Sequence, residues 1–246
     1  MPRADKAGAE KPVAKRLSFD VDPALLRENR VYVEATDETS KIAISAYKSL
    51  RTHILRELRA RNVNSLVVTG TTAGVGKSVT AANLAVNIAR HKDHKVLLVD
   101  LDLRAPTVAQ LFGFKPALGI DHIETASPIF PAAVVHPNIQ NLALLPCTRG
   151  QQDSTEMLLA PKMRALLNYL RTYRQDTIVI FDAPPVLGCD DVAAITPFMD
   201  LCLMVVSEGE TNRRELAQAL ETLGDAPVGA VLLNKSSSKF FGRYYY

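Results

Sequence analysis

Residues 65–80 read SLVVTGTTAGVGKSVT, and this stretch decides the fold. An apolar, β-prone run ends in small residues, a glycine-bearing loop with Lys77 and Ser78 follows, and the residues after Ser78 have the pattern of a helix. Strand, glycine-rich loop, Lys-Ser pair and helix make up the layout of a phosphate-binding P-loop, whose backbone N–H groups and helix N-terminus face the phosphates. The residues predicted to bind the nucleotide here are Ala73, Gly74, Val75, Gly76, Lys77, Ser78 and Val79.

The glycine spacing of this loop departs from the usual pattern. The motif G-x-x-x-x-G-K-[ST] requires its first glycine at position 71, where Thr71 stands, and the nearest glycine is Gly70. A flexible Gly/Thr turn that contains Gly-Lys-Ser by chance is therefore the alternative interpretation.

Length and composition fit one large α/β domain. The chain has 246 residues, of which 47% are hydrophobic and 22% charged, enough for a sizeable core. Its three cysteines lie far apart without a CxxC pair, which predicts reduced thiols. The N-terminus lacks an apolar core and no apolar run approaches the length of a membrane span, so we expect a cytoplasmic chain without a signal peptide.

Apolar runs alternate with helical patterns along the rest of the chain. Strands are predicted at 65–70, 95–100, 142–146, 177–182, 201–206 and 228–233. Helices are predicted at about 77–91, 106–112, 155–173, 190–196 and 211–223. Near-continuous apolar strands separated by helices predict a doubly wound, mostly parallel sheet with helices on both faces. In such a sheet, ligands bind at the carboxyl ends of the strands.

Carboxylates follow two of these predicted strands. Asp100 and Asp102 would face the same way if the strand continued, and such a pair can organise Mg²⁺ and accept a proton. A solvated pair at a strand end is the alternative. Asp182 ends another strand, as a Mg²⁺-holding carboxylate would. Asp190 and Asp191 begin a predicted helix, and we interpret them as capping residues rather than catalytic ones.

The N-terminal 60 residues are predicted to form an arm and a helix. Residues 1–40 would be a basic, largely disordered arm, with 1–22 disordered and 23–40 partly ordered. Residues 41–60 would form an amphipathic helix capped by Thr39 or Ser40. Its apolar positions recur every four residues: Ile42, Ala46, Leu50, Ile54 and Leu58.

The last part of the sequence, residues 236–246, is a polar tail. It ends in three consecutive tyrosines, Tyr244, Tyr245 and Tyr246, and it carries no acidic residue. Aromatic residues at the end of a polar tail serve no core. A small docking peptide or an accidental sticky tail is the alternative to a functional role.

Together these segments resemble the bacterial tyrosine kinases of capsule and exopolysaccharide synthesis over residues 41–246. AGVGKS is similar to the family's Walker A segment, VLLVDLDLRAP to its Walker A′ segment and IVIFDAPPVL to its Walker B segment. The helix AYKSLRTHI resembles the helix with which that family assembles protomers, and the terminal tyrosines resemble its autophosphorylation cluster. The resemblance implies a P-loop kinase domain at residues 41–235.

The family's activity is the Mg·ATP-dependent phosphorylation of protein tyrosine, chiefly in the tail of a neighbouring protomer, which regulates polysaccharide polymerisation and export. Its implied partners are the cytoplasmic segment of a membrane activator, further copies of the chain and a tyrosine phosphatase. Nucleic acid is not expected. The activator would hold the chain peripherally at the inner face of the membrane.

The resemblance also implies roles for side chains at the strand ends. Lys77 and Ser78 would hold the phosphates and Mg²⁺, and Asp102 and Asp182 would complete the metal shell. Lys77, with the two aspartates of the Asp-x-Asp segment and the arginine after it, makes up the implied catalytic set.

Three of these roles concern groups around the substrates. Asp100 would be the base for the incoming tyrosine, and Asn234 would contact adenine. Arg104 would steady the Asp-x-Asp segment.

The chain departs from the family pattern in its assembly helix. The family has Glu-x-x-Arg-x-x-Arg, whereas the corresponding residues here are Ser45, Lys48 and Arg51. A lysine cannot reproduce the planar, bidentate contacts of an arginine, so a closed ring of protomers is in doubt. The sequence also shows no attached membrane module, so an activator would act in trans.

Two other functions remain open at this point. A partition-type or positioning ATPase would share the fold and the aspartates, although Thr72 stands where those proteins place a second lysine. The other is a catalytically weak, nucleotide-gated module of a polysaccharide export complex, which the altered assembly helix would fit.

Overall fold

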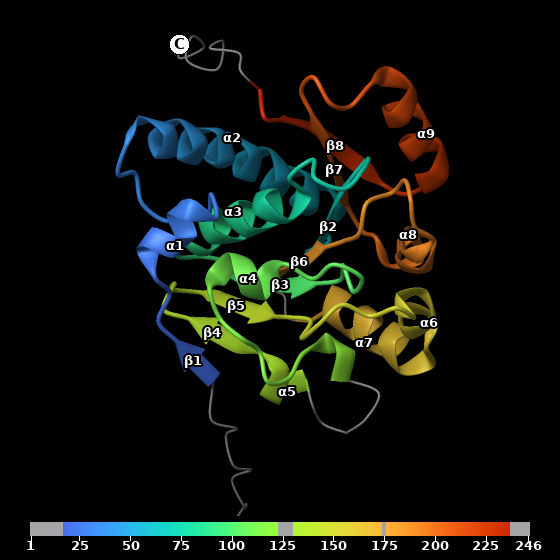
Figure 1. Cartoon of the computed structure of the whole chain (residues 1–246), viewed down its shortest axis with the longest axis horizontal. Coiled ribbons are helices and arrows are strands. Elements are labelled where there is room, and N and C mark those ends of the chain that lie inside the picture. Colours follow the sequence, from blue (N-terminus) through green and yellow to red (C-terminus); the bar gives the residue numbers. More distant parts are fainter. Residues whose placement is uncertain (1–16, 123–129, 174–175, 237–246) are drawn as a thin grey trace, which may run out of the picture.

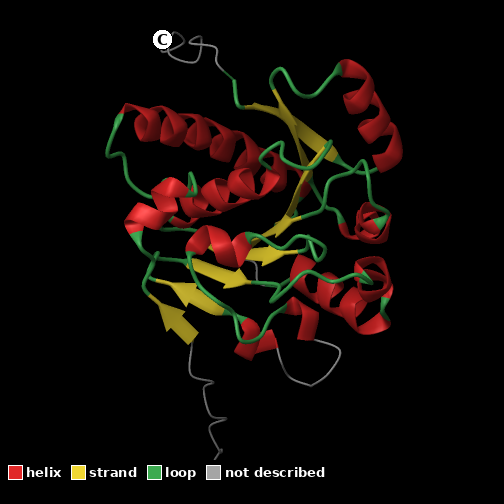
Figure 2. Ribbon diagram, in the orientation of Figure 1, coloured by secondary structure: helices red, strands yellow, loops and turns green. Residues whose placement is uncertain are grey.

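Eight strands form one sheet in the computed structural model of the chain, which describes residues 17–122, 130–173 and 176–236 (Figure 1; Figure 2). Their order is β1-β4-β5-β3-β6-β2-β7-β8. The strands are β1 (Leu17–Phe19), β2 (Ser65–Gly70), β3 (Lys95–Asp100), β4 (Val135–Pro137), β5 (Leu142–Leu145), β6 (Thr177–Asp182), β7 (Cys202–Ser207) and β8 (Val228–Asn234). All six predicted strands are therefore confirmed, and β1 and β4 are additional.

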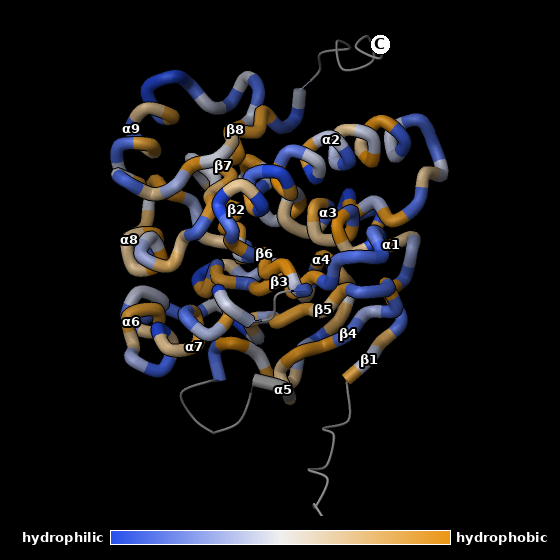
Figure 3. The backbone as a smooth tube through the Cα atoms, turned by 180° about the vertical axis from the view of Figure 1, so that it is seen from behind, coloured by the Kyte–Doolittle hydropathy of each residue, from blue (hydrophilic) through white to orange (hydrophobic). Residues whose placement is uncertain are grey.

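Most neighbouring strands are parallel, as predicted. Only the β4–β5 pair is antiparallel among the strand pairs that the structure describes. The central strands β2, β6 and β7 are buried over their whole length, because helices cover both faces of the sheet. Figure 3 shows the hydrophobic colour along the central strands of the sheet, the hydrophilic colour on many outer loops, and alternating colours along the outer helices.

Two groups of helices cover the two faces (Figure 1). On one face lie α1 (Pro23–Glu28), α2 (Glu38–Arg61), α3 (Lys77–Ala89) and α4 (Val108–Phe112). On the other lie α5 (Phe130–Ala133), α6 (Ser154–Leu159), α7 (Pro161–Arg171), α8 (Asp191–Ile195) and α9 (Arg213–Leu223). Two short 3₁₀ turns, η1 (Ile120–His122) and η2 (Thr196–Phe198), complete the described elements.

The predicted helix at 155–173 is two helices. Helix α6 ends at Leu159 and α7 begins at Pro161. A proline has no N–H for the helix ladder and is favourable at the first helical position, so the chain breaks and restarts there.

The N-terminal arm is more ordered than predicted. Residues 17–19 form β1, which pairs with β4, so the prediction of disorder for residues 1–22 is wrong there. Leu26 and Val31 are buried, and the Tyr32 N–H donates to Asn83 Oδ1 on α3 at 2.9 Å. The arm thus packs onto the same face as α3.

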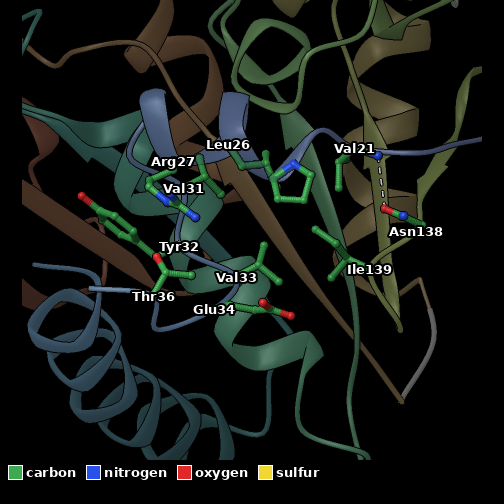
Figure 4. A pocket seen from close by; sticks show the side chains of 11 residues that line it. Val21, Leu26, Arg27, Val31, Tyr32, Val33, Glu34, Thr36, Asn138 and Ile139 are labelled. Atoms are coloured by element: carbon green, nitrogen blue, oxygen red, sulfur yellow. Dashed lines mark hydrogen bonds between the residues drawn. The ribbon is translucent and has the colours of Figure 1, made fainter. Parts of the chain in front are cut away.

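A cavity of about 210 Å³ lies beneath this arm (Figure 4). Arm residues such as Leu26 and Val33 line one side. Val21, whose N–H donates to Asn138 Oδ1 at 3.2 Å, lies on the other side with Asn138 and Ile139. Its described lining includes no predicted site residue.

Helix α2 is present but turns a different face to the core. Ile54 and Leu58 are buried as predicted, whereas Ile42 is 59% exposed, Ala46 is exposed, and Ile44 is buried instead. A spacing of four residues advances about 40° beyond a full turn at each step, so a strict stripe winds around a helix of 3.6 residues per turn. A 24-residue helix is long enough for the stripe to leave the core.

The start of α2 is capped by a residue that the sequence interpretation missed. Asp37 Oδ1 accepts the Ser40 N–H at 2.7 Å, and Ser40 Oγ accepts the Asp37 N–H at 3.0 Å. The cap is therefore Asp37, and neither Thr39 nor Ser40 is the N-cap residue. This reciprocal pair is a capping box.

Candidate nucleotide site

The P-loop joins β2 to α3 at the carboxyl edge of the sheet. Gly74 and Gly76 have φ values of +82° and +94°, which only glycine adopts without strain. Gly76 is the N-cap of α3 and forms no side-chain capping bond. The first turn of α3 therefore presents its positive end to the loop, as a phosphate site requires.

Packing explains why the first glycine of the loop is Gly70 and not residue 71. A Cβ on Gly70 would lie 2.4 Å from Val75 Cγ2, so the loop closes back over this position. Thr71 instead extends the strand, since its N–H donates to Val205 O at 3.3 Å and its side chain is buried. Together with the two positive-φ glycines and the helix that begins at Lys77, this packing favours a P-loop shifted by one residue at its start over a chance turn.

Lys77 is already paired with a carboxylate of the next strand connection. Its Nζ lies 2.6 Å from Asp102 Oδ2 and 3.3 Å from Ser78 Oγ, and both members of the ion pair are buried. Burial alone would lower the pKa of Lys77, but the charges of Asp182 and Asp102 outweigh it and raise the pKa. The ammonium therefore stays charged at the floor of the site.

Asp182 is the carboxylate with unused bonding capacity. It ends β6, is fully buried, and neither of its oxygens has a hydrogen-bond partner among the described residues. Burial raises its pKa to about 6, and the charge of Lys77 and the Ser78 hydroxyl offset only part of this effect. A buried carboxylate without partners is a position that a cation would stabilise.

The residues present fit a Mg²⁺ ion that comes with a nucleotide. No group of three His, Cys, Asp or Glu side chains in the described ranges could hold a metal alone. Mg²⁺ typically uses one or two carboxylates with phosphate oxygens and water, and Ser78 and Asp182 offer such a half-shell. Asp102 was also predicted as a ligand, but its two oxygens accept from Lys77 Nζ and from the Ala105 N–H. Its place in the metal shell stays a prediction.

Asp100 and Asp102 do not project together from one strand. Strand β3 ends at Asp100, so the alternation that was expected to align the two side chains does not apply. Asp100 Oδ2 accepts the N–H groups of Thr107 and Val108, at the start of α4, at 3.0 and 2.9 Å, while Oδ1 has no partner in the described chain. Burial and the neighbouring Asp182 raise the pKa of Asp100.

Arg104 does not hold the Asp-x-Asp segment, and that prediction is wrong. Its Nε donates to Ser154 Oγ at 2.9 Å and to Asp191 Oδ2 at 3.3 Å. Asp191 is fully buried and accepts from the hydroxyls of Ser154 and Thr155, so its interpretation as a capping residue is wrong too. Asp190 is the N-cap of α8, without a side-chain capping bond. Nothing in the sequence indicated that Asp190 and Asp191 have different roles.

Asn234 lies at the end of β8 and holds the loop itself. Its Nδ2 donates to Val75 O at 2.9 Å, and a Cβ on Gly76 would lie 2.1 Å from the same nitrogen. Asn234 therefore fixes the backbone of the P-loop from the edge of the sheet, and its predicted contact with adenine stays a prediction.

These groups surround a cavity of about 460 Å³. The P-loop contributes Ala73, Gly74, Gly76, Lys77, Ser78 and Val79. The connection after β3 contributes Asp102, Arg104, Ala105 and Thr107, and the one after β6 contributes Pro184, Pro185, Gly188 and Cys189. Three strand ends that are far apart in the sequence thus form one site, in which Asp102 lines the cavity and Asp100 lies behind it.

Comparisons with known proteins agree with this geometry. The family model "CobQ/CobB/MinD/ParA nucleotide binding domain" matches residues 66–239. Tyrosine-protein kinase YwqD of Bacillus subtilis is 32% identical over 217 residues, which cover 87% of this chain and 90% of that protein. The chain belongs to the bacterial tyrosine-protein kinases, within that nucleotide-binding family.

Two further matches show how widely this kinase fold extends. The putative tyrosine-protein kinase EpsB of Ralstonia solanacearum is 30% identical over 202 residues, which are 82% of this chain but 26% of that protein. The solved BceF tyrosine kinase domain is 26% identical, with a TM-score of 0.68 over 77% of this chain and 76% of that one. EpsB therefore carries much sequence outside the part that resembles this kinase.

The predicted assembly residues of this kinase lie on α2 in different surroundings. Lys48 is exposed, whereas Arg51 is half-buried and its Nη1 donates to Asn87 O on α3 at 3.2 Å. Arg51 thus has an internal partner in the single chain. The tyrosines Tyr244, Tyr245 and Tyr246 lie outside the described residues.

Two further features of the described chain bear on the expectations for this kinase. Its three cysteines are free thiols, as predicted, and burial raises the pKa of Cys147 and of Cys202 to about 12. None of the helices in the described ranges combines the length and the apolar character that crossing a membrane requires.

Proposed function

We propose that the chain binds Mg·ATP in this cavity and transfers the γ-phosphoryl group to protein tyrosine, first of all to Tyr244–Tyr246 of another copy. The observation that carries the proposal is the convergence of Lys77, Ser78 and Asp102 on one cavity of a tyrosine-kinase P-loop. The buried Asp182 lies behind this lining, close enough for the charge of Lys77 to act on it. Phosphoryl transfer depends mainly on positioning and charge stabilisation, which this arrangement provides.

Each group of the proposed site has one task. Lys77 would give up its ion pair with Asp102 and neutralise the β- and γ-phosphates of ATP. Ser78 and Asp182 would hold the Mg²⁺ ion. When bound, Mg²⁺ supplies charge neutralisation on the phosphate oxygens. In this proposal the freed Asp102 carboxylate, which lines the cavity, takes the proton from the tyrosine Oη and is not a metal ligand. It replaces Asp100, the base expected from the sequence, because Asp100 is fully buried and does not line the cavity. The new bond forms between Oη and the γ-phosphorus, and the bond to the bridging oxygen breaks as ADP leaves.

The position of Asn234 supports the tail as the substrate. Only Lys235 separates the tail from Asn234, which itself contacts the P-loop. The twelve residues from Lys235 to Tyr246 can span at most about 40 Å when extended. That reach would serve the chain's own site or a neighbour's, and the family resemblance favours the neighbour.

The partners expected from the sequence belong to the same proposal. A membrane activator would present a cytoplasmic segment to the kinase and hold it at the inner face of the membrane. A tyrosine phosphatase would reset the tail, and the cycle would regulate polysaccharide polymerisation and export. Support for this wider setting comes from the resemblance to the tyrosine kinases of capsule and exopolysaccharide synthesis, since the relatives' names give the kinase activity alone.

Mass spectrometry of the tail tests the proposal. We expect the purified protein to acquire phosphate on Tyr244–Tyr246 with Mg·ATP, and the Lys77→Met variant to acquire none. ADP release without phosphotyrosine would instead indicate an ATPase of the partition type. Neither product, even with an activator's cytoplasmic segment present, would indicate a nucleotide-gated module.

A mixing experiment tests the transfer between copies. Lys77→Met protein with an intact tail is incubated with protein that has Lys77 but lacks residues 237–246. Phosphate on the inactive chain requires transfer between copies, and its absence, with normal labelling of the native chain alone, would restrict the reaction to the chain's own tail.

A further inference from the structure

The side chain of Arg104 is partly exposed, yet three side chains of the protein bind its guanidinium group. Its side chain is 46% exposed, yet Nε donates to Ser154 and Asp191, and Nη2 donates to Thr155 Oγ1 at 3.4 Å. Among the described residues no acceptor bonds to Nη1. One edge of the guanidinium is thus bound to the protein, while the residue lines the cavity beside the P-loop.

The group that holds this edge is built as a unit. The Asp191 carboxylate is completely buried, Oδ1 accepts from Ser154 Oγ at 3.0 Å and from Thr155 Oγ1, and Oδ2 accepts from Arg104. Two hydroxyls and one guanidinium therefore satisfy a carboxylate that would otherwise be costly to bury. Asp191 comes from α8 and the hydroxyls from α6, so two elements converge on Arg104.

The backbone near Arg104 is fixed by the segment that leads into α6. The Gln151 N–H donates to Leu103 O at 2.8 Å, and a Cβ on Gly150 would lie 2.6 Å from Arg104 O. Main chain and side chain of Arg104 are thus both held by residues 150–155. An exposed arginine without a task would not need this support, because long side chains lose considerable entropy when they are fixed.

We propose that Asp191 is a positioning residue, which holds the guanidinium of Arg104 so that its free edge meets an oxygen of the transferred phosphoryl group. This inference rests on the proposed function. A guanidinium offers parallel N–H donors that match phosphate oxygens, and its value in the transition state depends on orientation. Asp191 touches no substrate and acts through Arg104 alone.

The sign of the charge change separates positioning from simple electrostatics. Asp191→Asn removes one negative charge close to the cavity, so a purely electrostatic role predicts tighter nucleotide binding and no loss of rate. A positioning role predicts instead that the rate of tail phosphorylation falls. We expect kcat for tail phosphorylation to fall about 10- to 100-fold, with KM for ATP unchanged within about twofold.

The matched control is the neighbouring Asp190→Asn, which removes the same charge from an exposed residue without a side-chain capping bond. Its rate should equal that of the native protein. Arg104→Lys keeps the positive charge but loses the planar set of guanidinium N–H donors. We expect this variant to be as slow as Asp191→Asn.

A double-mutant comparison tests whether Asp191 acts through Arg104. In an Arg104→Ala background, Asp191→Asn should cause no further loss, since the two changes remove one interaction. Free guanidinium ion should restore part of the activity of Arg104→Ala but not of the Arg104→Ala/Asp191→Asn protein. Additive losses, or equal rescue of both proteins, would overturn the proposal.

One readout does not need activity. The Nε–H resonance of Arg104, assigned by its loss in Arg104→Lys, should be protected from solvent exchange in the native protein and exposed in Asp191→Asn. Folding of each variant is checked by its melting temperature and by its binding of a fluorescent ATP analogue. If the native chain labels its tail and Asp191→Asn labels it equally fast, the positioning role is wrong and the kinase function stands. If the native chain transfers no phosphate, the proposed function fails, and the Nε–H resonance still decides whether Asp191 orders Arg104.

Discussion

Helix α3, which begins at the P-loop, and helix α2 pack against each other on one face of the sheet (Figure 1). The β2–α3 junction and helix α2 nevertheless encode their roles differently. At the junction, positive φ values and close packing leave almost no choice of residue. Helix α2 has an exposed face and a buried face, and its sequence predicted the buried face correctly at Ile54 and Leu58 but not at Ile42. Roles that depend on local backbone geometry are therefore readable from a motif, whereas roles that depend on helix orientation are not.

The largest effect is expected at the strand end that faces the junction. Asp182→Asn removes the buried carboxylate whose oxygens lack partners, and tail phosphorylation should fall about 10²- to 10³-fold. Mg²⁺ should also cease to increase the melting temperature in the presence of ADP. The control is Asp153→Asn on an exposed residue without a capping bond. Undiminished activity of Asp182→Asn would remove this residue from the metal site.

The two faces of α2 provide the next test. Ile54 is completely buried and Ile42 is 59% exposed, although both belong to the apolar spacing of the sequence. Ile54→Ala should lower the free energy of unfolding by about 2–5 kcal/mol. Ile42→Ala should change it by less than about 0.5 kcal/mol. Urea denaturation measures both, and equal losses would contradict the orientation of the helix.

Glycine substitutions sharpen the comparison at the junction. Both Gly74→Ala and Gly76→Ala place a Cβ at positive φ, but only Gly76→Ala also collides with Asn234 Nδ2. Because positive φ costs a non-glycine residue about 1–3 kcal/mol, we expect Gly76→Ala to weaken nucleotide binding about tenfold or more, and Gly74→Ala to weaken it less. Titration with a fluorescent ATP analogue measures both variants. The reverse order would show that Asn234 does not restrict the loop.

The smallest effect concerns the cap of α2. The Ser40 N–H and hydroxyl hold the pKa of Asp37 below its usual 3.8. A lowered pKa means that Asp37 stabilises the fold above about pH 4 and loses this contribution as the pH falls through its folded-state pKa. Asp37→Ala should lower the melting temperature by about 2–4 °C at pH 7, with a shrinking difference in more acidic buffer. A difference independent of pH would exclude the carboxylate as the cap.

The N-terminal arm and the loops after β3 and β6 also contain residues whose roles depend on contacts with distant parts of the chain. Residues 17–19 carry too little pattern to predict a strand, and they become one only because β4 offers an edge to pair with. Asp100 and Asp102 were expected to face the same way, yet Asp100 binds the N–H groups at the start of α4 and Asp102 pairs with Lys77. Asp191 was read as part of a helix start, because its hydroxyl partners lie 36 and 37 residues away in the chain.

The sequence by itself determined six of the eight strands, the P-loop, the aspartates at and after the strand ends and the kinase family. These features are local: apolar runs form buried strands, and glycines with a Lys-Ser pair form a phosphate loop wherever they stand. Only the tertiary structure decided which face of α2 is buried, that Asn234 holds the loop, and that Asp191 holds Arg104. Those contacts join residues far apart in the chain, and their geometry exists only once the sheet has brought the strand ends together.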